Sequence, residues 1–224
     1  MKTKRLLVAV STVLGALSLS AQLQAAQPDP NAPLPEMGFF ITSVGLGKGG
    51  ELGGLAGADA HCQALAADAG AGHRTWRAYL STQGVDAVNA RDRIGKGPWA
   101  NAKGIVMATN LTSLHYDNSN FTFEHILDEN GNQFDSRIDG DYDTTEHDVL
   151  TGTQIDGSAF PVGDDRTCNN WTSSTTGSAW VGHADRYSFA DPGSPWNASH
   201  ATPGCTQQNL ISVGGAGLLY CFAE

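Results

Sequence analysis

The sequence predicts an α+β domain that is held together by disulfide bonds. One amphipathic helix is expected over residues 57–69, where apolar side chains recur at helical spacing. Short segments before and after it are β-branched, aromatic or alternating, which is typical of strands. The chain of 224 residues also has four cysteines behind a signal-like leader, and an even number in an exported chain favours two disulfides.

The first 26 residues have the layout of a secretory signal peptide. Three basic residues precede an apolar run over residues 6–19, and small residues suit cleavage after Ala25 or Ala26. The run is shorter than the roughly 20 residues that a membrane span requires. We therefore expect a secreted protein, periplasmic or extracellular, with no membrane insertion. Residues 27–37 are expected to form a proline-rich arm, and residues 38–224 to form the domain.

The expected mature chain is strongly acidic. Removing the leader removes three of the thirteen basic residues and none of the acidic ones, which leaves 10 basic and 23 acidic residues and a net charge of −13. Such a surface repels nucleic acid and anionic membranes. We therefore expect no nucleic-acid partner, whereas cations, neutral glycans and basic proteins are compatible with the charge.

The first elements of the domain lie around the expected helix. Residues 38–44 are apolar and β-branched enough for a strand. Residues 45–54 contain six glycines and are expected to turn tightly. The helix over residues 57–69 carries Cys62 on its apolar side and ends at a following glycine. Residues 76–80 alternate as a half-buried strand does.

The middle of the chain is less regular. Residues 85–94 are interpreted as a short second helix, and residues 104–109 as a strand. Residues 117–148 are polar, acidic and without periodicity. We expect long loops there, with one short element around residues 121–127.

Regular structure is expected to resume at residues 149–152. Residues 178–181 are interpreted as a short strand. Residues 185–206 contain three prolines and are expected to be loops. The last strand is expected over residues 216–222, which are apolar and include Cys221.

The cysteines favour disulfides over a metal site. Zinc sites usually bring cysteines in close pairs such as C-x-x-C, and the chain has no such pair. Three pairings are possible from the sequence alone. The four residues are Cys62, Cys168, Cys205 and Cys221.

Two parts of the chain resemble a known family. Residues 49–82 contain GGELGGLAGADAHCQ and RTWRAYLST, and residues 152–224 contain GTQIDGSAF, TCNNWTSSTTG and LLYCFAE. These motifs resemble endostatin, the C-terminal domain of certain vertebrate collagens, and a set of secreted bacterial domains. The resemblance implies a C-type-lectin-like fold with a mixed sheet, two short helices and long loops.

The resemblance also implies a nested disulfide pairing, in which Cys62 bonds to Cys221 and Cys168 bonds to Cys205. The zinc and heparin sites of endostatin are not expected here, because residues 27–35 contain no histidine and the chain lacks arginine clusters. The calcium-dependent sugar site of C-type lectins is not expected either, because neither Glu-Pro-Asn nor Trp-Asn-Asp occurs.

An acidic stretch suggests one metal site. Asp139, Asp141 and Asp143 alternate in the sequence DGDYD, and closely spaced oxygen ligands on an irregular loop suit calcium. The EF-hand pattern is incomplete, because a threonine and a leucine replace its glycine and its glutamate. A solvated acidic loop is the alternative. We assign no cofactor other than this candidate calcium.

Aromatic side chains near loops suggest a carbohydrate-binding surface. An exposed tryptophan or tyrosine offers a flat apolar platform to a sugar ring. Trp196 is expected to be exposed in this way. The alternative is that tryptophans fill a small core, which we prefer for Trp171. The candidate ligand-binding residues are Trp196, Asn197, His200 and Tyr142.

The sequence favours a secreted, non-catalytic binding module that acts as a monomer and recognises carbohydrate or an extracellular or envelope protein. No G-x-S-x-G motif is present and both cysteine pairs are expected to be oxidised, so no catalytic residue is assigned. One alternative is a secreted hydrolase that uses loop aspartates and histidines. The best candidate for it is His147, between Glu146 and Asp148. A purely structural envelope protein is the other alternative.

Overall fold

The computed structural model describes residues 33–136, 145–187 and 193–224. Residues from Leu34 onwards form one compact unit. No helix in the described ranges is long and apolar enough to cross a membrane. The predicted signal peptide, most of the proline-rich arm and the acidic stretch DGDYD lie outside the described residues.

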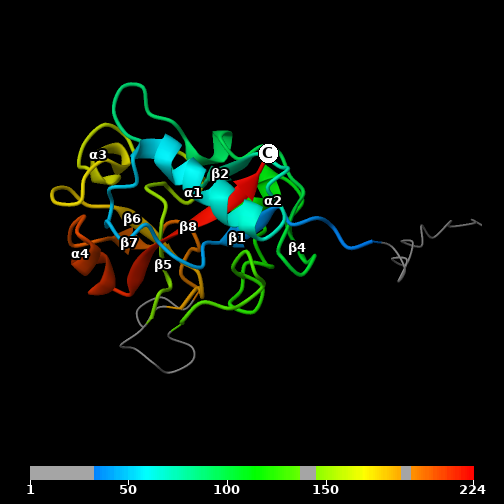
Figure 1. Ribbon diagram of the computed structural model, residues 1–224. Coiled ribbons are helices and arrows are strands. Elements are labelled where there is room, and N and C mark those ends of the chain that lie inside the picture. Colours follow the sequence, from blue (N-terminus) through cyan, green and yellow to red (C-terminus); the bar gives the residue numbers. More distant parts are fainter. Residues whose placement is uncertain (1–32, 137–144, 188–192) are drawn as a thin grey trace, which may run out of the picture. The chain divides into compact units, whose positions relative to one another are not determined.

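A mixed six-stranded sheet confirms the predicted α+β class (Figure 1). Its strands are β1 (Phe39–Ile41), β2 (Trp76–Ala78), β5 (Asp148–Leu150), β6 (Trp180–His183), β7 (His200–Ala201) and β8 (Gly215–Ala223). The longest strand, β8, pairs antiparallel with both β1 and β2. β5 lies parallel to β8, and β6 and β7 continue the sheet in antiparallel fashion. The first and last strands of the domain are therefore neighbours.

The two faces of β8 are packed by different parts of the chain. Successive side chains of a strand point to opposite faces. Tyr220 and Phe222 lie in one hydrophobic cluster together with Trp99. Leu219 and Cys221 lie in the other cluster. Both faces of this strand are covered. This explains why apolar residues follow one another in β8 instead of alternating with polar ones.

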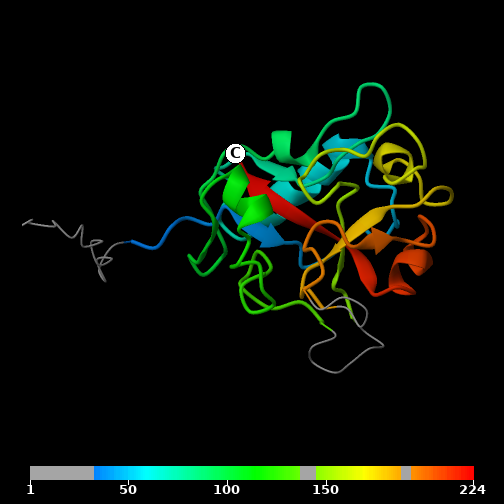
Figure 2. The same ribbon diagram turned by 180° about the vertical axis from the view of Figure 1, so that it is seen from behind.

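Helix α1 (Gly54–Asp68) packs on the second of these faces and lies across β8 in both views (Figures 1 and 2). The helix predicted over residues 57–69 is confirmed, and it starts three residues earlier, after a left-handed Gly53. Small side chains on the buried side let it lie close to the sheet. The buried residues of the helix are Ala58, Cys62 and Ala66.

Both disulfides follow the nested pairing. Cys62 of α1 bonds to Cys221 of β8, and Cys168 bonds to Cys205. Cys168 starts the short segment α3 (Cys168–Trp171), in which all four residues have positive φ values between 47° and 65°. L-residues rarely adopt this left-handed conformation. The bond to Cys205 and the Thr167 side chain, which accepts a hydrogen bond from Asn170, hold the turn in place.

Two predicted elements are wrong. Residues 85–94 form a loop with one short 3-10 turn, η1 (Ala90–Asp92), instead of a helix. Val85 is 94 % exposed while Ile94 is fully buried, so the apolar residues of this stretch do not share one buried face. Residues 121–127 form turns rather than a helix or a strand.

Strand β7, which lies within the residues 185–206 that were expected to be loops, and two short helices besides the left-handed segment α3 were not predicted. α2 (Leu111–Tyr116) and α4 (Gln207–Ile211) begin after Asn110 and Thr206, whose side chains accept a hydrogen bond from the backbone three residues further on. A separate two-stranded sheet pairs β3 (Trp99–Ala100) with β4 (Val106–Ala108). The predicted strands at 38–44, 76–80, 104–109, 178–181 and 216–222 are all found, with ends shifted by up to three residues, and the regular structure expected at 149–152 is strand β5.

Gly182 lets strand β6 pass close to the backbone of Trp196. A Cβ atom on Gly182 would lie 1.9 Å from the carbonyl oxygen of Trp196. The Gly182→Ala variant is therefore expected to lower the free energy of unfolding by about 3 kcal/mol, because backbone has to move. Urea denaturation measures the loss. Gly163→Ala is the matched control, since its new Cβ would be 3.9 Å from the nearest atom, and equal losses in both variants would contradict the packing argument.

Candidate metal centre

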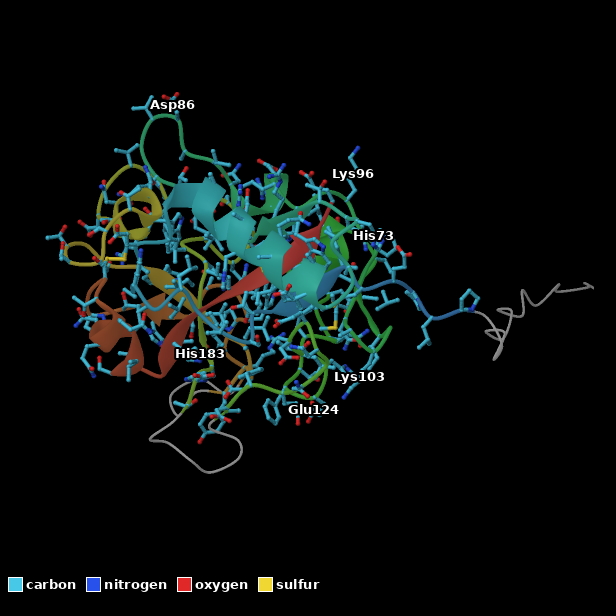
Figure 3. The ribbon with its side chains drawn as sticks, viewed as in Figure 1. His73, Asp86, Lys96, Lys103, Glu124 and His183 are labelled. Atoms are coloured by element: carbon cyan, nitrogen blue, oxygen red, sulfur yellow. A yellow bond between two sulfur atoms is a disulfide. The ribbon has the colours of Figure 1, made fainter. Side chains whose placement is uncertain are left out.

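The register of three neighbouring strands gathers polar side chains at one end of the sheet. Asp148 of β5 lies directly opposite His183 of β6, and His200 of β7 pairs with Val181. Because side chains alternate between the two faces, Asp148, His183 and His200 share one face. Figure 3 shows His183 in the lower part of the ribbon, whereas Asp86 lies at its top.

His147 joins this group from the position just before β5. Its ring stacks on the ring of His183, with the centroids 4.5 Å apart. The Nε2 atom of His147 lies 3.4 Å from Oδ1 of Asp148, and the Nε2 atom of His183 lies 3.2 Å from the same oxygen. The Nε2 atom of His200 lies 3.4 Å from the other oxygen, Oδ2. Three imidazole Nε2 atoms therefore surround one carboxylate.

The second ring nitrogen of each histidine is fixed by an acceptor. Nδ1 of His147 lies 2.9 Å from Oδ1 of Asp185. Nδ1 of His183 and Nδ1 of His200 lie 2.7 and 3.1 Å from backbone carbonyl oxygens. Because these oxygens only accept, each Nδ1 donates, and in a neutral ring Nε2 then carries the free lone pair. Metal-binding histidines are commonly oriented by such a partner on the other nitrogen.

Asp185 is the buried partner of His147. It also accepts hydrogen bonds from the Ser136 hydroxyl at 2.7 Å and from the Tyr187 backbone N–H at 2.8 Å. Burial acts to raise the pKa of Asp185, but the hydrogen bonds that it accepts from His147, Tyr187 and Ser136 outweigh burial, and the pKa is lowered. The residue is therefore a carboxylate that holds the His147 ring in one orientation.

Asp148 is an ionised group with almost no access to solvent. Its side chain is 1 % exposed. Burial acts to raise its pKa, but the rings of His183 and His200 lower the pKa to about 2. The ring nitrogens lie close to the Asp148 oxygens but not at hydrogen-bonding angles. Both Asp148 oxygens and the Nε2 atoms of His147 and His183 therefore lack hydrogen-bond partners among the described residues. Each unpaired buried polar atom costs about 1–3 kcal/mol.

A divalent ion placed among these atoms would satisfy three of them, namely the two Nε2 atoms and one oxygen of Asp148. One ligand atom each from His147, Asp148 and His183 lies within 4.8 Å of the other two. Ligand atoms bound tetrahedrally to zinc at about 2.0–2.1 Å are separated by about 3.3 Å. The observed nitrogen–oxygen distances of 3.4 and 3.2 Å agree with that separation. Two imidazoles and one carboxylate suit zinc and other first-row transition ions.

The predicted carbohydrate platform is wrong for two of its residues. Trp196 and Asn197 are only 0 % and 1 % exposed. Trp196 packs against Phe121 and Tyr79, and the Asn197 amide donates a hydrogen bond to the Tyr79 hydroxyl. Both side chains build the core, because the chain between β6 and β7 folds inward here. Trp171, which was expected in the core, is fully buried.

The remaining candidates from the sequence have different positions. His200 is 39 % exposed and faces Asp148, so it belongs to the histidine cluster. His147 and Asp148 are in contact within the cluster. For the neighbouring Glu146, burial and the charge of Asp135 raise the pKa of the carboxyl group. The candidates outside the described residues, which stay predictions, are Tyr142, Asp139, Asp141 and Asp143.

Sequence reasoning missed His183 and Asp185. The available signal was a pair of short motifs: His147-Asp148 directly before residues 149–152, where regular structure is expected, and His-Ala-Asp at 183–185 shortly after the expected strand 178–181. In an antiparallel pair, the start of one strand meets the end of its partner. Recognising that these two strands are neighbours would have been necessary to bring the motifs together.

The fold and the site define a disulfide-bonded α+β domain with a buried histidine–aspartate cluster. Residues 46–188 match the model of a family described as a protein of unknown function, DUF1554, and the chain belongs to that family. The matched segment contains His147, Asp148, His183 and Asp185 and ends before His200. A comparison with curated proteins finds no match.

Proposed function

We propose that this chain is an exported binding domain built around one divalent transition-metal ion. The ion is held by Nε2 of His147, Nε2 of His183 and the carboxylate of Asp148. The observation that carries the proposal is the set of four buried polar atoms that face one another without hydrogen-bond partners among the described residues. The acceptors on both Nδ1 atoms prepare the two rings for this role.

An alternative is a metal-free cluster in which protonated histidines pair with Asp148, but it explains the arrangement of the four unpaired atoms less well. A protonated His183 would be expected to align its N–H on Asp148, yet the 3.2 Å contact lacks hydrogen-bond alignment. The rings of His147 and His183 also stack at 4.5 Å, where two positive charges would repel each other. Neutral rings that share a bound cation avoid both problems.

Zinc binding to the demetallated, disulfide-bonded protein is the direct test. We expect one zinc ion per chain by calorimetric titration. At about 100 times the dissociation constant, zinc should raise the free energy of unfolding by about 2.7 kcal/mol, because the ion binds the folded state alone. Asp148→Asn keeps the size of the side chain but removes the charge, and it should weaken zinc binding at least about 100-fold.

His73→Ala is the control for this titration. His73 is 61 % exposed and pairs only loosely with Glu36 at 3.7 Å, far from the cluster in Figure 3. Its loss should leave the zinc affinity unchanged. Absence of zinc binding in a wild-type protein with both disulfides formed, or equal binding by Asp148→Asn, would reject the metal centre.

The domain is proposed to be secreted, to the periplasm or beyond the cell. The signal-like leader over residues 1–26 supports export, and the two disulfides fit an oxidising compartment. The finer fold assignment, C-type-lectin-like of the endostatin type, is supported by the pairing of β1 with β8 and by the nested disulfides.

The binding role is proposed for a carbohydrate or for an extracellular or envelope protein. The long irregular segments between the short strands offer the surface, although a fold alone does not determine a ligand. Retention on a glycan array that is lost with a chelator would support metal-dependent recognition of sugars. Lack of retention on glycans and on envelope proteins would leave a structural role.

A secreted hydrolase is the second candidate, and the same donor set favours it. Ions held by histidines and a carboxylate can polarise a substrate oxygen or lower the pKa of bound water. Turnover in a hydrolase screen that is lost in both His147→Ala and Asp148→Ala would support this candidate. A zinc-loaded wild-type protein that turns over none of the substrates would count against it.

A further inference from the structure

We infer that the bound ion keeps one coordination position open to an exchangeable oxygen-donor anion, such as a carboxylate, which enters beside His200. This inference rests on the proposed metal centre. It assigns His147, Asp148 and His183 as the permanent ligands and His200 as a wall of the entrance. The centre would then be a ligand-binding site rather than a closed structural site.

The arrangement around Asp148 separates His200 from the other two rings. His147 and His183 both approach Oδ1, whereas His200 approaches Oδ2. The group of atoms that lie within 4.8 Å of one another contains His147, Asp148 and His183. Three donors on one side of a tetrahedral ion leave its fourth position free.

Burial places that free position toward solvent on the His200 side. The side chains of His147, Asp148 and His183 are 0 %, 1 % and 5 % exposed. The His200 side chain is 39 % exposed, and its ring meets that of His183 edge to face with the centroids 5.0 Å apart. It also lies on β7, the last strand at this edge of the sheet. An external ligand therefore reaches the ion past His200.

The charge of the centre selects an anion. A divalent ion with two neutral imidazoles and one carboxylate has a coordination sphere of net charge +1, and the ionised Asp185 behind His147 brings the whole buried cluster to zero. The second buried carboxylate, Asp185, is turned to Nδ1 of His147 and to the Tyr187 backbone N–H, so it does not compete for the ion. Oxygen donors are compatible with a zinc-type ion that already has nitrogen and oxygen ligands. A monoanionic carboxylate as fourth ligand neutralises the coordination sphere of the ion.

Cobalt substitution tests this inference, because the visible absorption of protein-bound Co²⁺ depends on its ligands. Acetate is titrated into the Co²⁺-loaded protein at constant ionic strength, with perchlorate as the weakly coordinating control. We expect a saturable shift of the cobalt bands with acetate and none with perchlorate. His200→Ala should weaken cobalt binding by less than about tenfold and keep the acetate response, whereas Asp148→Asn should weaken binding at least about 100-fold.

Two other results would overturn the inference in distinguishable ways. Bands that acetate does not shift, together with a loss of at least about 100-fold in cobalt affinity for His200→Ala, would make His200 the fourth ligand of a closed site. The metal centre itself would survive that result. A wild-type protein that binds neither cobalt nor zinc would remove the metal centre and the open position with it.

Discussion

Replacing Cys62 and Cys221 together by alanine is expected to lower the free energy of unfolding by about 5 kcal/mol. The bond joins residues that are 159 positions apart, and a cross-link that closes a longer loop removes more conformational freedom from the unfolded chain. Domains are stable by only about 5–15 kcal/mol in total. The variant should therefore be marginally stable, as equilibrium denaturation in guanidinium under non-reducing conditions would measure.

The second disulfide supplies the matched comparison. Cys168 and Cys205 are 37 positions apart, so replacing both by alanine is expected to lower the free energy of unfolding by about 4 kcal/mol. Both double variants remove two cysteines and leave no free thiol. A larger loss for the second pair would contradict the loop-length argument, and it would identify the left-handed turn at residues 168–171 as the feature that depends most on a cross-link.

The elements that the sequence predicts correctly are those whose pattern reflects burial. Helix α1 shows it best, because alanines and Cys62 recur at helical spacing and lie against β8. Strand β8 is apolar throughout because both of its faces are covered. The helix predicted over residues 85–94 is wrong because Val85 has the character of a core residue in the sequence but is exposed to solvent. Its local pattern holds no information about which side the core is on.

The candidate site was predictable only in part, since strand register decides it. His147 and Asp148 are adjacent in the sequence and attract attention as a pair. His183 and His200 reach them only because β6 pairs with β5 and β7 pairs with β6, each in a defined register. The aromatic hypothesis failed for the same reason. Trp196 is flanked by proline and asparagine, as exposed loop residues often are, but its chain segment folds against Tyr79 and Phe121.

Zinc binding is expected to weaken steeply as the pH falls, by about 100-fold per pH unit where both histidine ligands take up a proton. The pKa of Asp148 is lowered to about 2, so this carboxylate stays ionised above about pH 4 and does not exchange a proton for the ion there. Imidazole ligands must be neutral to bind, so protons compete with the ion for both histidine ligands. Two histidine ligands therefore give a slope of about two protons per ion, which competition with a fluorescent zinc chelator can measure.

Release of zinc should not be caused by a loss of the Asp148 contribution to stability. A carboxylate whose folded pKa is below its unfolded value contributes stability that is complete above the unfolded pKa of about 3.9. The contribution of Asp148 is lost only as the pH falls toward about 2, and circular dichroism at each pH separates zinc release from unfolding caused by the two protonated rings. His200→Ala should keep the slope of two. A wild-type slope of three that falls to two in this variant would assign His200 as a ligand, and an affinity independent of pH would argue against any histidine ligand.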